Sequence, residues 1–168
     1  MRKANIVTAL IALALVAGVV SIAVPNVLTA RNRSRQKRTM ADMRTIATAW
    51  EARATDRNSY TVEPDRHATR GNDPADFAKL HSVPVADLER ALVPRYIRKL
   101  PRTDGWGNEF DLRTGAYNEK GEAQSYAIRS FGNDGRADGH LYKGGVITNF
   151  KGDLVYANGS FLQFPEGI

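Results

Sequence analysis

The sequence predicts an α+β fold in which a long N-terminal helix packs on a small antiparallel sheet of about four strands. The first supporting observation is an uncharged apolar stretch that continues, without a turn, into an amphipathic pattern of helical period. The second is a series of short alternating runs separated by Gly, Asp and Asn, which is typical of strands and turns. The third is a final pair of such runs around Asn158-Gly159, a dipeptide that favours a tight hairpin turn.

The expected helix begins with its most apolar part. Residues 4–30 carry no charge, Arg2 and Lys3 precede them, and about 20 apolar residues suffice to cross a bilayer as a helix. We therefore expect residues 1–30 to form the transmembrane or assembly half of a stem helix that is kinked at Pro25.

The second half of the stem, residues 31–60, is expected to be amphipathic. Its apolar residues recur at helical spacing and form one stripe, which we expect to lie against the folded domain. The Asp-Arg-Asn-Ser run at 56–59 is expected to end the helix. The stripe consists of Met43, Ile46, Ala47, Trp50 and Ala54.

Residues 61–168 are expected to form a globular sheet domain. The patterns predict an ordered loop or short helical turns over 61–84, a short helix over 85–93, strands over 108–113 and 124–131, a Gly/Asp/Asn-rich loop over 132–152, and a terminal hairpin. With 168 residues, the chain is long enough for this one domain and the stem.

The positive charge of the chain is concentrated in the stem. Residues 1–60 hold ten Lys or Arg and three Asp or Glu, a balance of +7, whereas residues 61–168 hold fourteen and fifteen, a balance of −1. A near-neutral domain lacks the electrostatic footprint of a nucleic-acid partner, so none is expected. Five cations of the stem could contact the headgroups of membrane lipids. A solvated helix face explains them equally well. They are Arg31, Arg33, Arg35, Lys37 and Arg38.

No residue pattern in the sequence indicates an active site. Metalloprotease, nucleophile-elbow and phosphate-loop motifs are absent, and the absence of cysteine excludes thiolate catalysis and disulfides. Glu109 and Asp111 alternate on a predicted strand, and an exposed polar face explains them better than a catalytic pair. Trp50 and Trp106 are predicted to be core residues that link helix to sheet. The sequence therefore predicts a protein that is not an enzyme.

Five segments carry a resemblance to a known family: "VPN", "MADMRTIATAWEARATDRNSY", "YIRKLPRTDGWGNEF", "YAIRSFGNDGRADG" and "GDLVY". Their order and spacing resemble the type IV pilin superfamily, and most of all the major pseudopilin of type II secretion systems. In the third segment, Gly105 stands where the family has proline. The resemblance implies a structural subunit with one inner-membrane span and a periplasmic C-terminal domain. It also implies assembly with other pseudopilin or pilin subunits and with inner-membrane assembly proteins.

The N-terminus departs from the family pattern. Pilin precursors are cut after a glycine that precedes a phenylalanine, and a glutamate follows shortly after. When Pro25 is placed on the family's helix proline, Lys3, Ala4 and Thr8 stand at these three positions. These departures put prepilin processing and polymerisation by the usual route in question.

The resemblance further implies calcium binding by the loop that contains "SFGNDGRADG". Calcium takes roughly 6 to 8 oxygen ligands. The loop offers the carboxylates of Asp134 and Asp138, that of Asp153 if the loop folds back, and the carbonyl of Phe131. The pattern is not an EF-hand, because Arg136 stands at the third position. Turn formation alone would also explain these Asp, Asn and Gly residues.

Two other interpretations remain open at this point. A minor type IV pilin for adhesion or DNA uptake would carry a basic or aromatic patch on its domain, which the charge balance disfavours. A secreted binding module or enzyme, released by signal cleavage near Ala23, would have a mature N-terminus at Val24. The second interpretation assigns no role to a helix that continues past Pro25.

Overall fold

The computed structural model describes residues 2–62 and 71–166, and within the first helix it leaves undescribed the side chains of residues 2–12, 15–17, 19, 20 and 22. The chain divides into two compact units, Met1–Ser34 and Arg35–Ile168.

Helix α1 spans Arg2–Arg57 and contains Pro25. It ends in the predicted run, because Asn58 adopts a left-handed conformation with a φ of 53° and the Ser59 N–H donates to the Ala54 carbonyl at 3.2 Å. A long helix is therefore confirmed, while the kink at Pro25 stays a prediction.

The first unit presents apolar side chains at its surface. Leu13, Val24, Val27 and Leu28 are each at least half exposed. Among the residues that the structure describes, no helix has both the length and the apolar composition that a membrane crossing requires. The apolar stretch on which the predicted span rests consists mostly of residues with undescribed side chains, so the anchor stays a prediction.

The second unit contains a six-stranded sheet of order β1-β2-β3-β5-β6-β4. Neighbouring strands are antiparallel except β4 and β6, which are parallel. The α+β class with a long helix packed on a sheet is confirmed, and the sheet has six strands and one parallel pair where about four antiparallel strands were predicted. The strands are β1 His81–Val83, β2 Asp111–Thr114, β3 Tyr126–Ser130, β4 Gly145–Ile147, β5 Leu154–Ala157 and β6 Ser160–Pro165.

The two strands that the sequence did not predict are the edge strands. Both β1 and β4 have three residues, which is too short for the alternation that identifies a strand. Each lies in a segment for which the sequence predicted no strand, 61–84 for β1 and 132–152 for β4. Their pairing with a neighbour, and not their own pattern, makes them strands.

The other elements lie close to their predicted positions. Helix α2, Val85–Leu92, matches the predicted short helix. The hairpin of β5 and β6 turns at Asn158 and Gly159, whose φ values of 45° and 89° are those that a tight two-residue turn requires. A single 3-10 turn, η1 Gly132–Asp134, begins the predicted loop.

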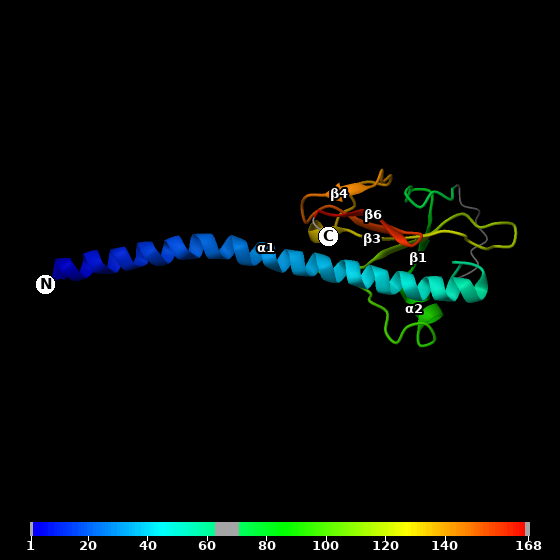
Figure 1. Ribbon diagram of the computed structural model, residues 1–168, viewed down its shortest axis with the longest axis horizontal. Helices are drawn as coiled ribbons and strands as arrows, with labels where there is room; N and C mark the ends of the chain where they lie inside the picture. Colours follow the sequence, from blue (N-terminus) through cyan, green and yellow to red (C-terminus); the bar gives the residue numbers. More distant parts are fainter. Residues whose placement is uncertain (1, 63–70, 167–168) are drawn as a thin grey trace. The chain divides into compact units, whose positions relative to one another are not determined.

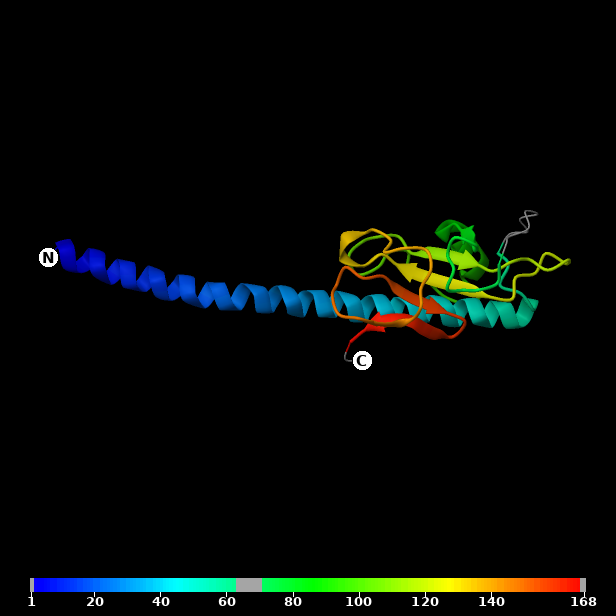
Figure 2. The same cartoon turned by 90° about the horizontal axis from the view of Figure 1, so that it is seen from above.

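Strand β3 is buried on both faces. On the first face, Tyr126 and Ile128 belong to the main hydrophobic core together with apolar residues of α1. Figure 1 and Figure 2 both show the strands beside the cyan, C-terminal half of this helix. Trp50 is fully buried there, as predicted, whereas Trp106 is only half-buried and the prediction for it is wrong. The helix contributes Met40, Met43, Ile46, Ala47, Ala49 and Trp50 to this core.

The second face of β3 is covered by loops. Ala127 packs there in a smaller apolar cluster with Phe77, Tyr142 and three further residues. Two backbone hydrogen bonds join the covering segments, from Phe77 N to His140 O at 2.7 Å and from Tyr142 N to Ala75 O at 3.0 Å. The second face therefore lies beneath the loop for which the resemblance implied calcium.

Candidate functional site

Residues 131–153, here named the acidic loop, bring two of the predicted calcium ligands together. The Asp138 N–H donates to Asp153 Oδ2 at 3.0 Å, and the Asp153 N–H donates to Asp138 Oδ2 at 2.9 Å. Asp153 is fully buried and immediately precedes β5. The loop thus folds back on Asp153, which was the condition for this residue to join the predicted site.

The third predicted carboxylate does not join this pair. Asp134 is exposed, and its Oδ1 accepts a hydrogen bond from the Arg136 N–H at 3.1 Å. The ring of Phe131 lies 4.9 Å from the Cζ atom of Arg129, while the role predicted for its carbonyl stays a prediction. Among the described residues, no three His, Cys, Asp or Glu side chains are grouped so that they could hold a metal ion.

The acidic loop satisfies the needs of a calcium ion only in part. Asp153 Oδ1 is buried and has no hydrogen-bond partner among the described residues, and such an oxygen would suit a cation. Two neighbouring carboxylates, however, are far from the roughly 6 to 8 oxygens that calcium requires. As placed, the side chains do not assemble a calcium site, and calcium binding stays an untested prediction.

A buried cation that the sequence did not single out lies beneath the acidic loop. Arg129 in β3 is 4% exposed. Its Nη2 atom donates to Asp111 Oδ2 at 2.5 Å, while Nη1 donates to the Gly139 carbonyl at 2.9 Å and to the Tyr142 hydroxyl at 2.8 Å. The Tyr142 hydroxyl in turn donates to Asp153 Oδ2. One guanidinium therefore connects strand β2 to the acidic loop.

Aromatic rings enclose the same guanidinium. The Arg129 Cζ atom lies 4.5 Å from the ring centroid of Phe77 and 5.8 Å from that of Tyr142, in addition to its contact with Phe131. A cation held over ring faces is attracted by the negative face of each ring. These contacts favour a charged guanidinium at a site from which water is excluded.

Asp111 is largely buried, in contrast to the exposed position predicted from the sequence. Its side chain is 9% exposed, and it forms ion pairs with Arg129 and, at 2.6 Å, with Nε of Arg113. The interpretation of Asp111 as part of an exposed polar face is therefore wrong, while Glu109 is exposed as expected. Asp111 lies directly opposite Arg129 in the β2–β3 ladder. Opposite charges at facing positions were the available signal, but they become visible only when the strand register is known.

The electrostatics of this network follow from burial. Burial opposes the charge of Arg129, but the Tyr142 hydroxyl and Asp111 outweigh it, and the pKa of Arg129 is raised. Burial, followed by the hydrogen bond to Asp153, raises the pKa of Tyr142, so its hydroxyl remains a donor. Burial and the neighbouring Asp138 also raise the pKa of Asp153 against the opposing effect of its hydrogen bonds.

The turn after Thr103 ties the first face of the sheet to helix α1. The buried Asp104 accepts hydrogen bonds from the N–H groups of Trp106 and Asn108, both at 2.9 Å, and from the Ser130 hydroxyl at 2.7 Å. The Gly105 N–H donates to Thr39 Oγ1 of α1 at 2.8 Å. A Cβ atom at position 105 would lie 2.4 Å from the Arg35 carbonyl oxygen.

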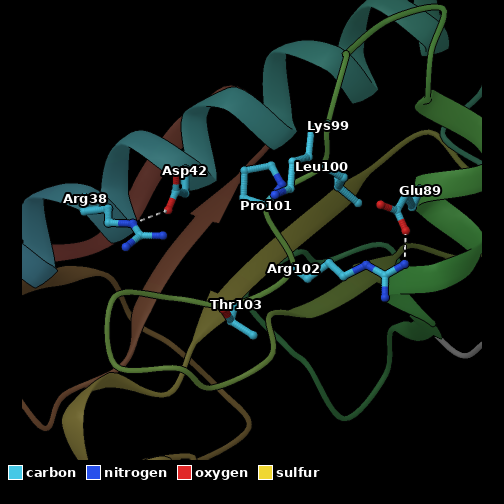
Figure 3. Close-up of a pocket in the computed structure, with 8 residues that line it drawn as sticks. All are labelled: Arg38, Asp42, Glu89, Lys99, Leu100, Pro101, Arg102 and Thr103. Carbon is cyan, nitrogen blue, oxygen red and sulfur yellow. Dashed lines mark hydrogen bonds and ion pairs between the residues drawn. The ribbon is translucent and has the colours of Figure 1, made fainter.

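A groove of about 550 Å³ lies beside the same turn, between α1, α2 and residues 99–103. Its two acidic side chains are already paired, Asp42 with Arg38 and Glu89 with Arg102 (Figure 3). Both arginines are largely exposed, and Leu100 forms part of the wall. The paired acids leave this groove without a general acid or base near a nucleophile, so its arrangement does not indicate catalysis. The lining residues are Arg38, Asp42, Glu89, Lys99, Leu100, Pro101, Arg102 and Thr103.

Comparison with known families shows to which family the chain belongs. The model of the family described as type II secretion system (T2SS), protein G, matches residues 26–149, which is more than half of the chain. The chain belongs to this pseudopilin family. No curated protein and no solved structure matched it. The resemblance seen in the sequence is thereby confirmed, and the family is one of structural secretion-system subunits, not of enzymes.

The glycine at position 105, where the resemblance places a proline, has a physical explanation. A proline has no N–H, so it could not make the hydrogen bond from residue 105 to Thr39. Glycine supplies this donor and also lacks the Cβ atom that would meet the Arg35 carbonyl. This pseudopilin therefore holds its turn against α1 by a direct backbone contact.

Proposed function

We propose that the chain is an inner-membrane pseudopilin subunit whose α1 helix packs with other subunits in a secretion pseudopilus, with the sheet domain in the periplasm. The family match over residues 26–149 carries this proposal. The exposed apolar residues of the first unit support it, because side chains such as Val27 and Leu28 would be covered by lipid or by neighbouring stems. The partners would be other pseudopilin subunits and the inner-membrane assembly proteins of the system.

Cysteine crosslinking tests the assembly, because the natural chain contains no cysteine. Val27→Cys and Leu28→Cys, each placed singly in the full chain, are expected to give crosslinked dimers and larger species in cells that secrete. Lys120→Cys, in an exposed turn of the sheet domain, is the matched control for random collision. Equal crosslinking at all three positions, or none in secreting cells, would contradict assembly through α1.

A secretion assay tests the role itself. Deletion of the gene is expected to leave the substrates of the type II system inside the cell, and the wild-type gene is expected to restore their release. Unchanged secretion together with loss of DNA uptake or adhesion would favour the alternative of a minor type IV pilin.

The mass of the N-terminus in native membranes tests anchoring and processing together. A mature protein that retains residues 4–23 and resists alkaline extraction is expected from the proposal. A protein that begins at Ala4 would mean that cleavage tolerates Lys3 before the cut and Thr8 after it. A soluble protein that begins at Val24 would refute the anchor and favour a secreted module cleaved after Ala23.

Calcium stabilisation of the acidic loop, which the resemblance implies, is a second candidate role for this loop, and it does not depend on assembly. The proximity of Asp138 and Asp153 supports it, whereas the outward position of Asp134 does not. Proteolysis of the wild-type chain in excess EGTA and in excess calcium tests it.

A further inference from the structure

We propose that Arg129 is the cation that closes the acidic loop, and that this loop is therefore held in its folded position without a bound metal ion. The guanidinium replaces the metal ion. It is a buried positive charge that donates hydrogen bonds to a loop carbonyl, a loop hydroxyl and a carboxylate.

The position of Arg129 in the sheet gives the guanidinium a rigid base. Strand β3 is paired on both sides, with β2 and with β5. Asp111, directly opposite on β2, fixes one end of the guanidinium through Nη2. The other end is left to reach the loop, where Nη1 binds the Gly139 carbonyl and the Tyr142 hydroxyl. A planar guanidinium can donate to the strand and to the loop at the same time, because its N–H groups point in fixed and different directions.

Three of the oxygens that a metal ion could use already accept hydrogen bonds from the protein, whereas Asp153 Oδ1 does not. Asp153 Oδ2 accepts from the Asp138 N–H and from the Tyr142 hydroxyl, and Asp138 Oδ2 accepts from the Asp153 N–H. The Gly139 carbonyl accepts from Arg129. The loop is therefore closed by a continuous chain of hydrogen bonds that runs from Asp111 to Asp138.

The charge of Arg129 also disfavours an additional cation at this position. The Tyr142 hydroxyl contacts both Arg129 and Asp153, so a calcium ion on Asp153 Oδ1 would lie close to the guanidinium. Two cations that share a buried site repel each other strongly, because little water is present to screen them. The closed loop is therefore expected to have a lower free energy with the Arg129 guanidinium alone than with the guanidinium and a calcium ion together.

Proteolysis of the wild-type full-length protein in detergent tests the proposal without a mutation. Lys143 is exposed in the acidic loop, and Lys120 is exposed in a separate turn that serves as an internal reference. A lysine-specific protease that does not itself need calcium is expected to cut at Lys143 at the same rate in excess EGTA and in excess calcium. Slower cutting at Lys143 in calcium, with Lys120 unchanged, would overturn the proposal and support a calcium site.

The variant Arg129→Met removes the charge and keeps much of the side-chain volume. Its cutting rate at Lys143 is expected to rise about tenfold in either solution, which corresponds to about 1.4 kcal/mol of lost protection against local opening. Arg129→Lys keeps the charge but not the paired donors. Its cutting rate at Lys143 is expected to lie between those of the wild type and Arg129→Met. Asp134→Asn is the matched control, because it removes a predicted calcium ligand that lies outside the network.

The outcomes separate the two accounts of the loop. If Arg129→Met is cut at the wild-type rate, Arg129 does not close the loop and the proposal fails. If Asp134→Asn opens the loop and Arg129→Lys does not, a metal site explains the data and the proposal fails equally. Should Arg129→Met not fold, the comparison of EGTA with calcium in the wild type still decides.

Discussion

On one face of strand β3, Tyr126 and Ile128 pack against apolar residues of helix α1, whereas on the other face Arg129 lies buried beneath a loop. The helix face is large, and its energy comes mostly from apolar area removed from water. The loop face has a small apolar cluster, and the ion-paired guanidinium of Arg129 lies over the ring of Phe77 in that cluster. A loop with few buried apolar residues of its own can therefore be held by a few directional contacts.

The two faces are expected to respond differently to mutation. Loss of an apolar side chain at the helix face leaves a cavity, and the cost grows with the volume removed. Loss of one charge at the loop face leaves its partner buried and unpaired, and the cost comes from that remaining charge. Variants at the two faces should therefore differ in how much they lower the free energy of unfolding.

The largest effect is expected at the centre of the helix face. Trp50 is fully buried, its ring centroid lies 5.2 Å from that of Tyr126, and its indole N–H donates to the Tyr60 carbonyl at 2.9 Å. Trp50→Ala should lower the free energy of unfolding by about 3–5 kcal/mol, because both the contacts and a large volume are lost. Urea unfolding of the full chain in detergent measures this effect. The half-buried Trp106→Ala is the control, and an equal loss in both variants would contradict the central role of Trp50.

The loop face is tested by removing the partner of its buried cation. Asp111→Asn keeps the shape of the side chain but leaves the charge of Arg129 without its carboxylate, and we expect a loss of about 3 kcal/mol. The same unfolding experiment measures it, with the exposed neighbour Glu109→Gln as control. A loss below about 0.5 kcal/mol, the range of ordinary surface substitutions, would mean that the ion pair does not hold the loop face.

The contact between turn and helix should give a smaller effect. Gly105→Ala places a Cβ atom 2.4 Å from the Arg35 carbonyl oxygen, so the turn must move away from α1 and weaken its bond to Thr39. We expect a loss of about 1–3 kcal/mol, the usual range for overpacking. Gly139→Ala is the matched control, since a Cβ atom there meets nothing within 4 Å. If the two alanine variants unfold at the same urea concentration, the turn does not depend on its close approach to the helix.

The two faces also differ in how far the sequence predicted them. The helix face was predicted well, because the stripe from Met43 to Ala54 repeats at helical spacing within a single segment. The hairpin at Asn158 and Gly159 was predicted for the same reason, since two adjacent residues define its turn. Local patterns of this kind can be recognised in a single sequence without knowing which strands pair with each other.

The loop face could not be predicted in the same way. Asp111 and Arg129 meet only because β2 and β3 pair in one particular register, which depends on contacts between distant segments. The edge strands β1 and β4 likewise depend on a neighbour and not on their own three residues. The return of Asp153 to Asp138 was foreseen as a condition of calcium binding, but the arginine beneath it was not. A buried Arg in a strand leaves no periodic signal, because in sequence it resembles any exposed polar position.

The smallest effect is expected for a single hydroxyl on the helix face. Tyr126 donates to Glu51 of α1 and accepts from the Gly159 N–H at 3.2 Å. Tyr126→Phe keeps the ring and removes these bonds, so we expect a loss of about 1 kcal/mol at neutral pH. Tyr96→Phe, which removes an exposed hydrogen bond to Asp56, is the control and should lose less.

The pH dependence of the same variant sharpens this prediction. Burial, followed by the hydrogen bond to Glu51, raises the pKa of Tyr126 above its ordinary value of 10.0. The folded protein then keeps this proton while the unfolded chain loses it, so the contribution of Tyr126 is full below that value and decreases as the pH rises above it. The difference in unfolding free energy between wild type and Tyr126→Phe should therefore shrink between about pH 9 and pH 11. Tyr60 and Tyr156 are present in both proteins, so their own titration cancels in the difference. A difference that stays constant over this range would show that the hydroxyl of Tyr126 is not withheld from solvent in the folded protein, and that the helix face is held by packing alone.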